Sequence, residues 1–171
     1  MVFTTYLFIG IAFVVAQTTF IRLLPFSNII FDLMIPYVLF LGMYRPGGMS
    51  IVLVMVNGSI MDIFSGGVFG IYLSIYLWIY FLTKKAHKYV MVREIASQSL
   101  MVALSVFGEN IVLWFIHVIG SKYHGLIYQD VGRILIMTLL GGLLGPLILL
   151  FLRCVDRSMV IRRSKLIERD V

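Results

Sequence analysis

Residues 49–82 read MSIVLVMVNGSIMDIFSGGVFGIYLSIYLWIYFL, an apolar stretch in which Asp62 is the only charged residue. As one continuous α-helix this stretch would be about 50 Å long, whereas the hydrocarbon core of a bilayer is about 30 Å thick. The sequence Ser65-Gly66-Gly67 divides the stretch near its middle, and paired glycines favour a turn. The stretch therefore predicts two membrane-spanning helices, 49–63 and 68–82, joined by a tight hairpin.

Four more apolar runs flank this hairpin, at residues 2–20, 29–44, 95–120 and 134–152. The run 29–44 contains Asp32 and Pro36, so we expect it to be short and kinked at the proline. The sequence thus predicts an all-α bundle of six transmembrane helices over residues 1–152. A short basic tail, 153–171, follows.

The composition agrees with a lipid environment. Apolar residues make up 61% of the chain and charged residues 13%, whereas soluble domains are nearly half apolar and about a quarter charged. No Lys or Arg precedes the first apolar run, which predicts a retained helix and not a cleaved signal peptide. The net charge of +6 is spread between the apolar runs and in the tail, which argues against a nucleic-acid partner.

The distribution of basic residues predicts the orientation. Six spans put both termini on one side, and the positive-inside rule makes the more basic side cytoplasmic. One side would hold Arg22, Lys122 and Arg133, and the side with both termini would hold Arg45, Lys84, Lys85, Lys88, Arg93, Arg153, Arg157, Arg162, Arg163, Lys165 and Arg169. Eleven against three places both termini in the cytoplasm.

Polar residues within the apolar runs are the candidate functional residues, because ionisable groups at membrane depth are costly. Asp32 and Asp62 are predicted near the outer face and Glu109 near the middle of its span, with Gln17 and Asn110 as neutral companions. Helical spacing puts Gln98, Ser105 and Glu109 on one face of the span 95–120, which should point into the bundle.

Three interpretations compete for these polar residues: hydrogen bonds between helices and caps at helix ends, a small-molecule pocket in the bundle, and a proton or ion relay. The first is the commonest use of polar groups inside membranes. A fourth interpretation is that these polar residues pair with a basic residue of a partner protein. We also expect the spacings Ala12-x-x-x-Ala16 and Gly141-x-x-x-Gly145 to allow close packing inside the bundle, and Pro146 to kink the last span.

Signatures of catalysis are missing from the sequence. It contains no Gly-x-Ser-x-Gly, no His-Glu-x-x-His and no phosphate-binding glycine-rich loop. The single cysteine, Cys154, excludes an intramolecular disulfide and a multi-cysteine metal site. We therefore expect a protein that is not an enzyme and has no cofactor or metal.

Several short motifs are similar to those of a known family. Gln17-Thr18-Thr19, Leu24-Pro25, Phe31-Asp32-Leu33, and Asp62-Ile63-Phe64-Ser65-Gly66-Gly67 with Gly70 beyond resemble the rod shape-determining protein MreD. The resemblance covers the first four spans, and the last two match in length and character only. The Asp-x-x-Ser-Gly-Gly hairpin is its most specific part.

The resemblance implies a non-enzymatic scaffold of the bacterial cell-elongation complex in the inner membrane. Such a protein binds MreC and helps to couple MreB to peptidoglycan synthesis by a RodA-type glycosyltransferase and a class B penicillin-binding protein, and so to cell shape. It also implies a fold similar to the S-components of energy-coupling-factor transporters. A vitamin-binding S-component is therefore the alternative function.

The last span favours the scaffold over this alternative. An S-component needs ligand-specific polar groups in its last loops and spans, whereas Thr138 is the only polar side chain in the run 134–152. Gene neighbours would discriminate the two, because MreB and MreC genes go with a scaffold and ATPase genes with a transporter.

Cys154 provides a direct test of the predicted orientation. With both termini cytoplasmic, a membrane-impermeant thiol reagent added to intact spheroplasts should leave Cys154 unlabelled, and permeabilised cells should label it. Labelling in intact spheroplasts would show that the predicted topology is wrong.

Overall fold

The computed structural model describes residues 2–20, 31–66, 69–87, 94–120 and 127–167. These residues form helices and turns and contain no strand, as the all-α prediction requires. Arg22, Gly67 and Lys122 of the predicted connections, and residues 168–171 of the tail, lie outside the described residues.

Each predicted run contains a helix, but α2 begins later than the run 29–44 and α6 extends beyond both ends of the run 134–152. They are α1 (Val2–Val15), continued by the π-helical turn η1 (Ala16–Phe20), then α2 (Met34–Tyr44), α3 (Gly48–Ser65), α4 (Ile71–Ala86), α5 (Ile95–Gly120) and α6 (Ile127–Ile167). Three of them contain segments long and apolar enough to cross a membrane: Gly48–Ser65, Ile95–Ile116 and Val131–Ser158. Phe3–Thr19 and Met34–Tyr44 are shorter apolar helices.

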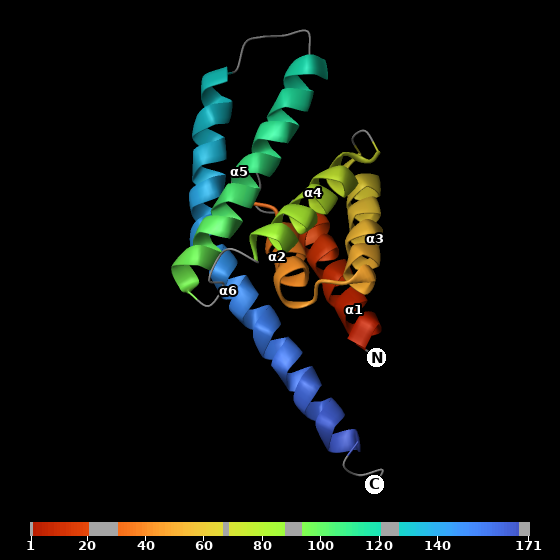
Figure 1. The fold of residues 1–171 in the computed structure, drawn as a ribbon. Helices are drawn as coiled ribbons and strands as arrows, with labels where there is room; N and C mark the ends of the chain where they lie inside the picture. The colour runs from red at the N-terminus through yellow and green to blue at the C-terminus, as the bar shows by residue number, and fades with distance from the viewer. Residues whose placement is uncertain (1, 21–30, 67–68, 88–93, 121–126, 168–171) are drawn as a thin grey trace.

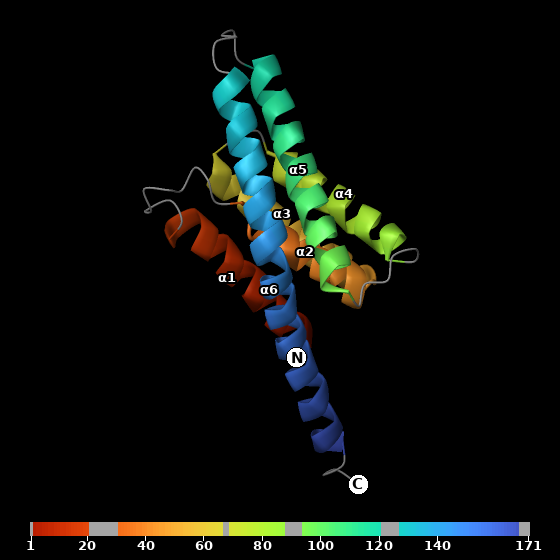
Figure 2. The same ribbon diagram turned by 90° about the vertical axis from the view of Figure 1, so that its left-hand side faces the viewer.

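An antiparallel hairpin of α5 and α6 stands beside a unit formed by α1–α4 (Figure 1). In Figure 2, where the protein is turned by 90°, α6 lies across the front of this unit and continues well beyond it. The predicted boundary between the last span and the tail, at residues 152 and 153, therefore falls inside a helix. Pro146 lies within α6, which bends along its length in Figure 1.

Helix α2 forms the centre of the protein. Its residues from Met34 to Met43 are all buried, and it packs against α4 and α6. Asp32 was expected inside this span but precedes the helix, and Pro36 occupies its first turn. The backbone N–H groups of a first turn have no partner within the helix, so the proline interrupts no hydrogen bond there. We expected Pro36 to kink this helix, but the proline lies in the first turn, where the helix starts.

Glycines of α6 allow it to approach α5 closely. A Cβ atom on Gly141 would lie 2.8 Å from a methyl carbon of Val106, and one on Gly145 would lie 2.4 Å from a methyl carbon of Val102. Both distances are too short for a side chain, so the predicted packing of this glycine pair inside the bundle is confirmed.

The first helix uses a different small residue from the ones we expected. A Cβ atom on Gly10 would lie 2.5 Å from the side-chain nitrogen of Asn57, so Gly10 is the close contact between α1 and α3. Ala12 is exposed, so it does not serve the close internal packing expected of its spacing with Ala16.

The hairpin between α3 and α4 begins at a glycine in the left-handed region. Gly66 ends α3 with a φ of +69°, so the predicted turn at the paired glycines begins in a conformation that favours glycine. Gly70, which precedes α4, has a φ of +99°. A Cβ atom at either position would meet open space, so only the backbone conformation restricts the residue type.

We predict that Gly66→Val lowers thermal stability and folded yield in membranes, because a β-branched residue at positive φ costs about 1 kcal/mol or more. Gly47→Val is the matched control. Gly47 also faces open space, but its φ of −177° is extended and suits any residue. Equal yields and melting temperatures for the two variants would contradict this account of the turn.

Candidate functional site: a lateral groove and the polar junction beside it

A polar junction joins the start of α2 to α4 and α5. One carboxylate oxygen of Asp32 accepts the backbone N–H of Met34 at 2.7 Å, and the other accepts the Tyr76 hydroxyl. The side chain of Glu109, on α5, lies beside Asp32 in the lining of one small cavity. Asp32 and Glu109 are only 7% and 4% exposed. Two of the predicted candidates, from runs far apart in the sequence, therefore meet inside the protein.

A small polar cavity of about 90 Å³ adjoins this junction. Its polar walls come from Gln17, Asp32, Tyr72, Glu109 and Asn110. The side-chain oxygen of Gln17, Oε1, accepts the backbone N–H of Leu33 at 3.1 Å and so ties η1 to the start of α2. Asn110 donates to a carbonyl of its own helix. The cavity thus gathers four of the predicted candidates: Gln17, Asp32, Glu109 and Asn110.

Asp62 has a separate, structural role. It lies in the last turn of α3, and its carboxylate oxygens accept the backbone N–H groups of Tyr72 at 2.9 Å and Leu73 at 3.2 Å. These amides belong to the first turn of α4, where free N–H groups and the helix dipole favour a negative charge. The Ser65 hydroxyl, at the end of α3, donates to the carbonyl of Asp62.

A lateral groove of about 980 Å³ separates α4 from α5. Its lining extends from Phe69 to Ala86 along α4 and from Ser97 to Ile116 along α5. At 1.5 Å per residue, the α5 wall is about 29 Å long, close to the thickness of a bilayer core. The groove is therefore long enough to follow a neighbouring molecule across the whole apolar layer.

The walls of the groove are mainly apolar. Trp78, Leu100 and Leu104 line it and are 70%, 61% and 60% exposed. Serine hydroxyls from Ser74, Ser97 and Ser105 interrupt this surface, and among the described residues Glu109 is the only ionisable side chain in the lining. Glu109 also lines the polar cavity, so it separates the groove from the polar junction.

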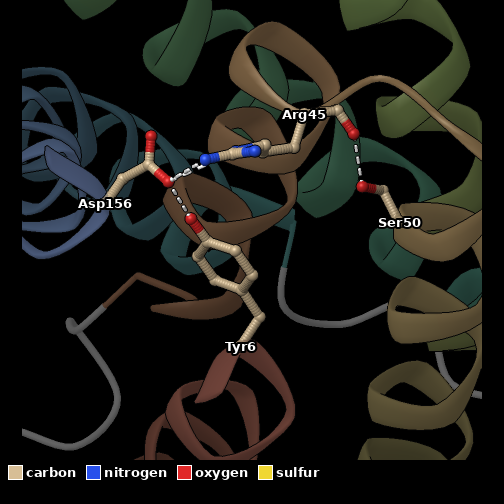
Figure 3. Close-up of polar contacts among 4 residues, drawn as sticks. All are labelled: Tyr6, Arg45, Ser50 and Asp156. Carbon is tan, nitrogen blue, oxygen red and sulfur yellow. Dashed lines mark hydrogen bonds and ion pairs between the residues drawn. The ribbon is translucent and has the colours of Figure 1, made fainter. Parts of the chain in front are cut away.

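A second polar cluster fastens α6 to the ends of α1 and α2. Asp156 accepts hydrogen bonds from the Arg45 guanidinium, at 2.7 Å from Nη2, and from the Tyr6 hydroxyl (Figure 3). The hydrogen bond from Arg45 to Asp156 is the main cause that raises the pKa of Arg45. Both side chains are partly exposed, so the ion pair contributes at most about 1 kcal/mol.

The chain around this cluster is held by two further contacts. The Ser50 hydroxyl donates to the carbonyl of Arg45 (Figure 3). The Arg153 guanidinium lies over the ring of Tyr44, 4.4 Å from its centroid, a cation–π contact. The start of the predicted tail is therefore packed against the bundle.

Sequence reasoning missed Tyr6, Tyr76 and Asp156. The two tyrosines looked like ordinary apolar-run residues, because their partners lie 150 and 44 positions away in the sequence. Asp156 did carry a signal, since it is the only acidic residue in the stretch 153–167. A single acid among basic residues is a natural candidate for an ion pair.

Among the described residues, no three His, Cys, Asp or Glu side chains are grouped to hold a metal ion. No family model, curated protein or solved structure matches the chain. The fold thus defines an all-helical protein with three helices able to cross a membrane, and its site is a lateral groove bounded by one buried acid.

We predict that Asp62→Ala lowers the stability of the purified protein by about 1 kcal/mol, because it removes a cap from the first turn of α4. Thermal unfolding in detergent measures the change. Ser59→Ala is the matched control, since the Ser59 hydroxyl donates to the carbonyl of Met55 within its own helix. A loss no larger than that of the control would show that Asp62 does not cap α4.

Proposed function

We propose that the protein is a non-enzymatic membrane scaffold whose groove between α4 and α5 receives the transmembrane helix of a single-span partner. The observation that carries this proposal is the length of the groove, whose apolar walls extend about as far as a bilayer core is thick. The groove would therefore match the length of a partner helix that crosses the same bilayer.

The physics of helix association in lipid supports this choice of partner. Apolar surface gains little by leaving lipid for protein, so helices associate through close packing and hydrogen bonds. A concave wall increases the packing contacts of an inserted helix, and the hydroxyls of Ser74, Ser97 and Ser105 offer hydrogen bonds along the groove. In this proposal the described helices form six crossings with both termini cytoplasmic, and the protein lies in the bacterial inner membrane.

The resemblance to the MreD family names the partners in this proposal. The groove would receive the single span of an MreC-like protein. The resulting complex would help to couple MreB to a RodA-type glycosyltransferase and a class B penicillin-binding protein, and thereby to cell shape.

A vitamin-binding S-component is the second candidate, and the size of the groove is the observation in its favour. Small-molecule sites have volumes of about 300–1,000 Å³, and the groove is at the upper end of this range. Such a ligand needs converging polar groups, however. The Thr83 hydroxyl is already bonded to the carbonyl of Ile79 in its own helix, and the serines are spread along the walls. The groove is therefore better suited to a helix.

Filling the groove tests the scaffold proposal. Gly108 lines the groove and a Cβ atom there meets open space, so Gly108→Trp adds bulk without a clash inside the protein. We predict that a detergent pull-down with the wild-type chain recovers an MreC-like single-span protein. Gly108→Trp should lose most of it, and depletion of the protein should round a rod-shaped cell.

Gly132→Trp is the matched control, because Gly132 is an exposed helical glycine of α6 that also faces open space and does not line the groove. It should retain the partner. Equal recovery with both variants would contradict the groove as the binding surface. Tight binding of a vitamin, together with recovery of a transporter ATPase module, would contradict the scaffold itself.

A further inference from the structure

Helix α6 is longer than a membrane crossing needs. Its 41 residues from Ile127 to Ile167 extend about 60 Å, whereas a bilayer is about 40–45 Å thick including its headgroups. In both views the C-terminal part of α6 projects from the bundle as a single helix (Figure 1, Figure 2). The helix therefore continues into water beyond one face of the bilayer.

Contacts with α1 and α2 fix the place where α6 leaves the bundle. Leu152 is fully buried, and one turn later Asp156 accepts hydrogen bonds from the Arg45 guanidinium and the Tyr6 hydroxyl. Arg45 directly follows the buried, apolar helix α2, so its ion pair with Asp156 marks the edge of the apolar layer. The next residue, Arg157, is exposed. The segment from residue 157 onward therefore projects from a fixed base.

The projecting segment, residues 157–167, carries positive charge only. Its charged residues are Arg157, Arg162, Arg163 and Lys165. Along the helix axis, Lys165 lies up to about 14 Å beyond Asp156. The headgroup layer on each side is about 5–8 Å thick, and physiological salt screens charges over about 8 Å. The far end of the segment is therefore past the headgroups, where water-soluble proteins can reach it.

The same segment lacks the pattern of a helix that lies flat on a membrane. Such a helix has one apolar face and one basic face. Consecutive residues of an α-helix are about 100° apart around its axis, so the consecutive Met159, Val160 and Ile161 span more than half of the circumference. The four basic positions alternate with the apolar ones around the axis. The segment is therefore suited to projecting from the bilayer and not to lying on it.

We propose that residues 157–167 are a docking arm for an acidic surface of a soluble cytoplasmic protein. Charge complementarity selects this occupant, because Arg and Lys side chains make strong, charge-assisted hydrogen bonds with carboxylates. The contacts of Asp156 hold the base of the arm, so a bound protein would be kept at a fixed place beneath the bundle. The proposal rests on the proposed cytoplasmic orientation of the C-terminus and does not depend on what fills the groove.

Fluorescence from the full chain in lipid nanodiscs distinguishes a protein-binding arm from a lipid-binding one. A Cys154→Ser, Ser164→Cys chain carries a dye at residue 164, within the arm. The dye should be equally accessible to an aqueous quencher in discs of zwitterionic lipid and in discs rich in anionic phosphatidylglycerol. Protection from the quencher in the anionic discs alone would show that the arm lies on lipid and would overturn the proposal.

An oligoglutamate peptide then serves as the acidic probe in zwitterionic discs. It should protect the dye, and Arg162→Glu with Arg163→Glu should weaken its apparent affinity about tenfold or more. Lys84→Glu with Lys85→Glu is the matched control, because it makes the same change in net charge in the last turn of α4. The control should bind the peptide nearly as well as the wild type. An equal loss in both variants would show a response to net charge alone and would overturn the arm.

Photo-crosslinking in cells tests the partner itself. A photoreactive residue at Ser164 should crosslink to a soluble protein, and the adduct should be lost with Arg162→Glu and Arg163→Glu but kept with the control pair. It should also persist in Gly108→Trp, so failure of the groove and failure of the arm are distinguishable. Adducts only to lipid, to nucleic acid or to a second copy of the chain would overturn the proposal. External labelling of Cys154 in spheroplasts would overturn the cytoplasmic partner as well.

Discussion

Asp32 accepts hydrogen bonds from the backbone at the start of α2 and from Tyr76 of α4, and it shares a small polar cavity with Glu109 of α5. In water, burial of the apolar faces would hold these helices together. In lipid that driving force is nearly absent, so buried polar bonds and close packing must fix the arrangement. The position of α2, whose residues from Met34 to Met43 are all buried, depends on this carboxylate at its start. Removing it would take away the hydrogen-bond partner of the buried Tyr76 hydroxyl.

The groove is a consequence of how the two units are assembled. Gly141 and Gly145 bring α6 so close to Val102 and Val106 that the α5–α6 hairpin packs as one unit. Asp62 fixes the start of α4 to the end of α3 in the other unit. Between these two pairs, α4 and α5 touch sparsely and leave apolar walls open along their sides. In the proposed scaffold, this open side is where a partner helix completes the packing.

The sequence alone predicted the features that depend on residues close together in the chain. The bounds of α5, the hairpin after α3 and the positive φ of Gly66 follow from apolar run length and glycine chemistry. The partners of Tyr6 and Tyr76 lie 150 and 44 positions away in the sequence, so no local pattern identifies them. The candidates Gln17, Asp32, Glu109 and Asn110 were found because polar residues stand out in apolar runs. Their meeting at one cavity, and the groove beside it, required the tertiary structure.

The most direct test of the central claim is site-specific photo-crosslinking in native membranes. A photoreactive residue at Leu104 would lie in the groove, and one at Leu143 would be equally lipid-exposed on α6 outside it. The scaffold account predicts a crosslink to a single-span membrane protein from position 104 and none from position 143. Crosslinks to lipid alone from both positions, or a protein adduct only from position 143, would contradict the groove as the place where the partner binds.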